Sequence, residues 1–144
     1  MASSIRFETV EPGDEMPPLE IALDPGFVRD YAIEIGMDAA RFTDAEGARR
    51  EGLPGQIAPG NLTLALLAHA LLAWAPRARL RRLGTTFRAL APAGTRARIF
   101  ATVTEKDAEA HTVECDVWME GPEGDRLVIG TATLELPAPA GATP

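Results

Sequence analysis

Residues 61–76 read NLTLALLAHALLAWAP, and this segment predicts the one long helix of the chain. Asn61 is a favourable N-cap residue, and Pro76 cannot continue a helix, so the segment has a start and a stop. Apolar side chains occupy nearly every side of the expected helix, about residues 61–75, which is typical of a helix buried on all sides. A sheet wrapped around the helix would provide that burial.

Four β-type segments follow the long helix, separated by turns rich in glycine, proline and aspartate. In the clearest of them, around Cys115, apolar residues alternate with polar ones and predict one buried face, on which Cys115 lies. We expect these strands at residues 79–90, 96–104, 113–119 and 127–136. A buried helix followed by an antiparallel meander predicts an α+β fold.

The region before the long helix predicts short elements. Asp24 and Pro25 form a typical helix start, and Gly36 a typical stop. In this first helix Phe27, Tyr31 and Ile35 would form one apolar stripe. Short strands are expected at residues 5–10 and 19–23, loops at 37–43 and 52–60, and a helix at about 45–51 capped by Asp44.

Length and composition predict one domain, about residues 1–136, with a disordered tail at 137–144. The net charge of −7 argues against general nucleic-acid binding. The longest apolar stretch, residues 62–75, is too short to span a bilayer, and the N-terminus does not resemble a signal peptide. One cysteine excludes an internal disulfide, so we expect a cytoplasmic protein.

Four motifs occur in an order that is known from one family. They are PGD at 12–14, the segment 31–60, RRLGTTFR at 81–88 and APAGT at 91–95. Together they resemble the MaoC-like hydratase/dehydratase family, which includes (R)-specific enoyl-CoA hydratases and 3-hydroxyacyl-thioester dehydratases, over residues 5–136. The resemblance implies the hot-dog fold, an antiparallel sheet wrapped around one long helix. It also implies acyl thioesters of coenzyme A or of a carrier protein as ligands.

The chain departs from the family at the catalytic positions. Catalytic members carry Asp-x-Asn-Pro-x-His-x-Asp-x-x-x-Ala, followed by Ile-Ala-His-Gly. Here Met37 stands at the aspartate, Phe42 at the catalytic histidine and Pro59 at the second histidine. A phenyl ring cannot move the protons that hydration of an enoyl thioester requires. The altered pattern is similar to non-catalytic halves of double-hot-dog hydratases and to substrate-recognition subunits, whose partner supplies the His/Asp pair.

The resemblance leaves this chain a role in substrate binding. Gly60 and Asn61 would begin the long helix, where unpaired backbone N–H groups can stabilise a thioester oxygen. Phe42 and Pro59 would line the same site. Asp38 is either an ordinary loop residue or a substitute acid/base whose pKa is raised by an apolar tunnel.

An arginine-rich stretch supplies a second kind of candidate. Arg79 and Arg81, together with Arg77, Arg96 and Arg98, could bind the phosphates of coenzyme A or of phosphopantetheine, because guanidinium donors suit phosphate. The alternative is a solvated strand edge that discourages wrong sheet pairing.

Neither histidine matches a catalytic position. We expect His69 in the core or at an interface and His111 in solvent, and neither has a second ligand-type residue at metal spacing. No metal and no cofactor are therefore expected.

Three functions remain open from the sequence. The first is a substrate-recognition subunit that lacks the His/Asp dyad. The second is a stand-alone dehydratase, isomerase or cyclase of a biosynthetic pathway that uses Asp38, and the third is a thioesterase-like hot dog. In each case we expect a homodimer or a heteromer with a His-containing hot-dog subunit, because a lone domain leaves a sheet edge open.

Overall fold

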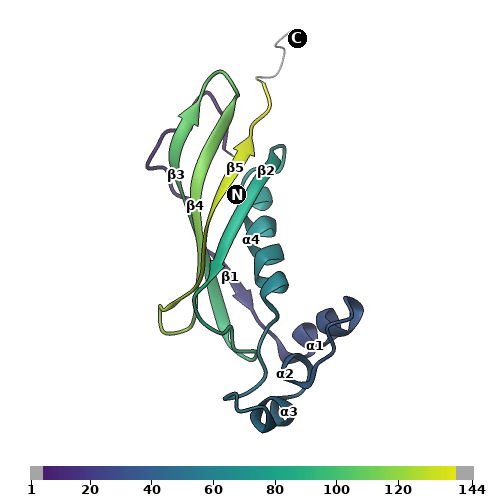
Figure 1. Ribbon diagram of the computed structural model, residues 1–144. Helices are drawn as coiled ribbons and strands as arrows, with labels where there is room; N and C mark the ends of the chain where they lie inside the picture. Colours follow the sequence, from purple (N-terminus) through teal and green to yellow (C-terminus); the bar gives the residue numbers. More distant parts are fainter. Residues whose placement is uncertain (1–4, 139–144) are drawn as a thin grey trace.

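The computed structural model describes residues 5–138, which form a five-stranded antiparallel sheet packed against one long helix (Figure 1). The strand order is β1-β3-β4-β5-β2, so β1 and β2 are the edges. The strands are β1 (Leu19–Ala22), β2 (Arg79–Phe87), β3 (Arg96–Asp107), β4 (Thr112–Glu120) and β5 (Arg126–Glu135). The helices are α1 (Pro25–Glu34), α2 (Ala40–Thr43), α3 (Ala45–Arg50) and α4 (Gly60–Trp74). This is the α+β arrangement expected from the sequence.

The core lies between α4 and one face of the sheet. In β4 the expected alternation is confirmed, because Val113, Cys115, Val117 and Met119 are all buried. They belong to the same apolar cluster as Leu67 and Leu71 of α4. Each fully buried side chain of this size contributes roughly 1.5–3 kcal/mol through removal from water.

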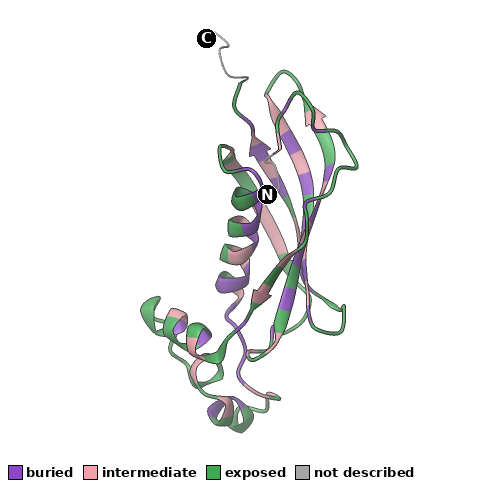
Figure 2. Ribbon diagram, turned by 180° about the vertical axis from the view of Figure 1, so that it is seen from behind, coloured by how far each residue is buried: buried purple, intermediate pink, exposed green. Residues whose placement is uncertain are grey.

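One side of α4 is open in the single chain, so the expectation of burial on all sides is wrong. Leu67 and Leu71 face the sheet and are fully buried, whereas Leu72 is 36% exposed. The exposed residues recur at helical spacing along the whole helix (Figure 2). We call them the open stripe of α4: Asn61, Ala65, His69, Leu72 and Ala73. The sheet covers only one side of the helix, and His69 therefore does not lie in the core.

The segment between β1 and α4 contains α1, α2 and α3, which project beyond the sheet as an overhang (Figure 1). The buried residues of α1 are Val28 and Ala32. The expected stripe is not the buried face, because Phe27 is 44% and Ile35 40% exposed. The expected loop at 37–43 contains the one-turn helix α2.

The caps of α1 and α3 are confirmed. The Asp24 carboxylate accepts hydrogen bonds from the backbone N–H groups of Gly26 (3.1 Å) and Phe27 (3.2 Å). The Asp44 carboxylate accepts one from Gly47 N at 2.9 Å. Each cap satisfies N–H groups that have no partner inside the first helical turn.

The expected strand at residues 5–10 is wrong. This segment forms a turn in which Val10 N donates to Arg6 O at 2.8 Å, and Phe7 and Val10 are both buried. His111 is not free in solvent either, since its ring stacks on Phe7 with centroids 4.0 Å apart. Within residues 5–138, no helix combines the length and the hydropathy that crossing a bilayer requires. Most of the expected disordered tail, residues 139–144, lies outside the described residues.

Candidate functional site

The start of α4 is the centre of the candidate site. Gly60 is the first residue of the helix, and Pro59 is the N-cap without a side-chain hydrogen bond. The backbone N–H groups of Gly60 and Asn61 donate no hydrogen bond to another described residue. Unpaired N–H groups at a helix start carry partial positive charge and can stabilise a developing oxyanion.

Asn61 is not the N-cap that the sequence suggested. It is the second residue of α4, and its side-chain amide Nδ2 lies 3.3 Å from Met37 Sδ. Pro59 takes the cap position because it supplies the extended backbone that precedes the helix. This contact places Met37, three residues after the end of α1, at the start of α4.

Phe87 covers Gly60 from the end of β2. A Cβ atom built on Gly60 would lie 2.9 Å from Phe87 Cζ, so the ring approaches this closely only because residue 60 is glycine. Phe87 is nevertheless 55% exposed. Phe87 lies inside the RRLGTTFR motif, but no local sequence signal marks it as a site residue.

Gln56 fastens the overhang to the segment that leads into α4. Its side-chain Nε2 donates to the carbonyl oxygens of Phe42 (2.8 Å) and Pro25 (3.1 Å). The residue is only 8% exposed. Ile57 N also donates to Arg41 O at 3.0 Å. Gln56 thus holds the first residue of α1 and the backbone of α2 beside the segment that leads to Gly60. The sequence around Gln56 has no regular pattern, so this role could not be predicted from it.

Phe42 and Asp38 occupy different surroundings. Phe42 is half-buried, and the Arg41 guanidinium carbon lies 5.5 Å from its ring centroid. Asp38 is exposed and forms no ion pair with a described residue. The apolar tunnel that would make Asp38 a substitute acid/base is therefore absent around it in the single chain.

Neither histidine lies at the start of α4. His69 is nine residues beyond Gly60 on the same helix, roughly 13 Å along the axis, and is exposed. His111 lies at the opposite end of the sheet, where its Nδ1 is 2.7 Å from Leu136 O. Among the described residues, no cluster of three or more histidine, cysteine or acidic residues could hold a metal ion.

Arg79 and Arg81 begin β2, whereas Phe87 and Gly60 meet at its end. Phe87 is eight residues beyond Arg79, which is about 26 Å along the strand. The guanidinium of Arg81 donates a hydrogen bond to Glu135, which holds the pKa of that carboxyl below its ordinary value. A single chain therefore does not bring these arginines to the helix start.

Cys115 is not a candidate nucleophile. Burial, reinforced by the neighbouring carboxylates Glu114 and Asp116, raises the pKa of its thiol to about 12. A thiol with such a pKa stays protonated and unreactive near neutral pH.

Solved hydratases and dehydratases share this arrangement of sheet, helix and overhang. R-Hydratase PhaJ1 from Pseudomonas aeruginosa matches with a TM-score of 0.86 at 19% identity, over 98% of this chain and 94% of that chain. A chain of the ChsH1-ChsH2 complex from Mycobacterium tuberculosis matches with 0.81 at 20% identity, over 90% and 99%. A MaoC-like dehydratase matches with 0.84 at 25% identity, over 93% of this chain and 43% of that chain.

No family model matches the chain, and no curated protein matches it. The structural matches nevertheless define the class: the chain has the hot-dog fold of MaoC-like dehydratases and (R)-hydratases. The resemblance inferred from the four sequence motifs is thereby confirmed at the level of the fold.

Proposed function

We propose that the chain is a MaoC-like hot-dog protein that binds an acyl thioester and serves as the substrate-recognition subunit of a heteromer. A second hot-dog chain would supply the histidine and the aspartate. The observation that carries the proposal is the composition of the site around Gly60. The helix start keeps unpaired N–H groups, while Met37 and Phe42 stand where the family has its proton carriers.

Hydration of an enoyl thioester needs a base for water, an acid for carbon and donors for the enolate oxygen. The N–H groups of Gly60 and Asn61 are suited to the third task. Phe42 and Met37 cannot perform the first two, because neither side chain exchanges a proton near neutral pH. A chain of this composition would position the thioester and leave the chemistry to its partner.

The surfaces left open in the single chain support a partner. β2 is an edge strand whose outer side pairs with no described strand. β2 packs against α4, which carries the open stripe, and β2 ends with the exposed ring of Phe87. An unpaired edge next to apolar side chains is typical of a surface that another chain covers. The match to a chain of the ChsH1-ChsH2 complex supports a partner of the same fold.

The test is hydration of crotonyl-CoA, followed by loss of absorbance of the conjugated thioester. The purified chain alone should show no enzymatic rate. The Met37→Asp/Phe42→His double variant should gain measurable hydration, because it restores both proton carriers beside the intact helix start. The single Phe42→His variant is the control.

Three results would change the proposed function. Hydration by the unaltered chain at an enzymatic rate would overturn the recognition-subunit proposal. If Asp38→Asn then abolished that rate, the chain would be a stand-alone enzyme with Asp38 as acid/base. Steady release of free thiol from acyl-CoA would indicate a thioesterase instead.

A further inference from the structure

The outer face of the sheet, opposite α4, carries large apolar side chains. When one face of an antiparallel sheet is in water, the residues on it are ordinarily polar. Here Phe100, Trp118 and Ile129 alternate with core residues and therefore lie on the outer face, where each is half-buried. α4 packs on the inner face, and α1, α2 and α3 lie beyond the end of the sheet (Figure 1). Apolar side chains left on such a face indicate a surface that another molecule covers.

Arginines and aromatic rings form a row on this face, which we call the ridge: Arg98, Phe100, Trp118 and Arg126. The rings of Phe100 and Trp118 stack with their centroids 5.4 Å apart. The guanidinium carbon of Arg98 lies 5.3 Å from the Phe100 centroid, and that of Arg126 lies 4.6 Å from the Trp118 centroid. Trp118 Nε1 also donates a hydrogen bond to the Glu120 carboxylate at 2.9 Å. Tryptophan and arginine, held in place in this way, are typical of the residues that dominate protein–protein binding.

A hollow of about 670 Å³ lies beside the ridge. Its floor contains four residues that are neighbours across β3, β4, β5 and β2, namely Thr102, Asp116, Thr131 and Gly84. They precede or follow the ridge by two residues along the strands, which is about 7 Å. Short side chains in one row and long side chains in the next therefore give this face a hollow and a ridge side by side.

The free charges of this face complement one another. Arg98 and Arg126 are exposed and form no ion pair with a described residue, and the same holds for Asp116 in the hollow. The chain as a whole has a net charge of −7, so two copies repel each other in general. A face that offers unpaired arginines beside an unpaired aspartate reduces that repulsion and provides opposite charges for the contact.

We infer that the outer face binds a second copy of the chain, with the ridge of each copy in the hollow of the other. A two-fold axis in the plane of contact, running across the strands between ridge and hollow, produces this reciprocal arrangement. The guanidinium of Arg126, which lies over Trp118, then meets Asp116 of the second copy. The contact uses neither the outer edge of β2 nor the open stripe of α4, so it can join two of the heteromers proposed above.

The size of the face indicates a reversible contact. Four strands about 4.8 Å apart, each contributing about eight residues at 3.4 Å, give a flat area of roughly 500 Å². A stable interface typically buries about 800 Å² on each partner. We therefore expect self-association with a Kd in the micromolar range.

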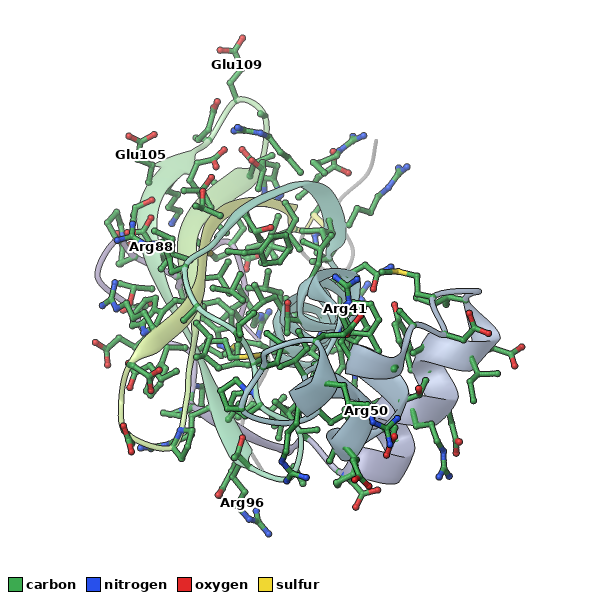
Figure 3. All side chains as sticks on the ribbon, turned by 60° about the horizontal axis from the view of Figure 1, so that its bottom comes forward. Arg41, Arg50, Arg88, Arg96, Glu105 and Glu109 are labelled. Carbon is green, nitrogen blue, oxygen red and sulfur yellow. The ribbon has the colours of Figure 1, made fainter. Side chains whose placement is uncertain are left out.

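Sedimentation velocity of the intact chain, from about 1 to 100 µM, tests the inference over the expected range of Kd. Arg126→Glu should weaken self-association by about tenfold or more, because it brings like charges together at both symmetric contacts. Asp116→Arg should have the same effect, and the charge-swapped variant Asp116→Arg/Arg126→Glu should restore association. Arg50→Glu is the matched control and should change nothing, since Arg50 belongs to α3 of the overhang (Figure 3). Circular dichroism verifies that each variant is folded.

Two further variants separate this contact from the other open surfaces. Thr131→Trp fills the hollow without changing a charge and should also weaken the association. Leu72→Glu, on the open stripe, should leave the step that depends on Arg126 unchanged. A mass independent of concentration, equal effects of Arg126→Glu and Arg50→Glu, or a charge-swapped variant that stays dissociated would overturn the inference and leave the outer face to a different occupant.

Discussion

Replacing Gln56 by methionine tests whether one buried amide holds the overhang in place. Methionine has nearly the same volume and flexibility but cannot donate a hydrogen bond. The variant therefore removes the bonds to Pro25 O and Phe42 O and creates no cavity. The overhang would then depend on its remaining contacts, among them the bond from Ile57 N to Arg41 O.

The expected loss of folding free energy comes from the two carbonyl groups that no longer receive a hydrogen bond. Each costs about 1–1.5 kcal/mol when its partner disappears, because both are only partly reachable by water. The total is about 2–3 kcal/mol, which for a chain of this size lowers Tm by roughly 6–12 °C. The urea m-value should not change, since the surface exposed on unfolding is the same.

Urea and thermal unfolding followed by circular dichroism measure this loss. Asn61→Leu is the control, because Asn61 is an exposed amide near Met37 and should change stability by less than about 0.5 kcal/mol. Hydrogen exchange should accelerate in α1 and α2 and stay unchanged in β4. A Tm within about one degree of the unaltered chain, with unchanged exchange in the overhang, would refute the role given to Gln56.

Three further predictions concern the sheet. Cys115, with its thiol pKa raised to about 12, should resist alkylation at pH 8 in the folded chain and react fully in urea, as mass spectrometry would show. Gly130→Ala should prevent stable folding, because its Cβ would clash with the carbonyl oxygen of Gly84 in β2, whereas Gly55→Ala, whose Cβ would meet no atom within 4 Å, should fold normally by circular dichroism. Arg81 lowers the folded-state pKa of Glu135. This ion pair therefore stabilises the fold above the unfolded-state pKa of Glu135, and its contribution is lost as the pH falls through the folded-state pKa. Arg81→Ala should remove this part of the acid dependence of the urea midpoint, and an unchanged pH profile would contradict the prediction.

The sequence by itself determined the elements whose signals are local. The caps at Asp24 and Asp44 depend on a carboxylate within three residues of the N–H groups it accepts from. The alternation around Cys115 determined which face of β4 is buried. Gly60 could be placed at the start of the long helix from the family motif, because the glycine and the apolar helix that follows it are recognisable in the sequence.

Tertiary structure alone decided how the candidate site is assembled. Gln56 has no local signal, since its partners lie 31 and 14 residues away. Phe87 contacts Gly60 because it lies at the end of β2 that is next to the start of α4. Arg79 lies at the opposite end of β2 and is therefore far from Gly60. The open stripe of α4 shows the general reason. An apolar sequence pattern predicts that a helix surface is covered. Only the packing of the chain shows whether its own sheet covers that surface or whether another molecule must cover it.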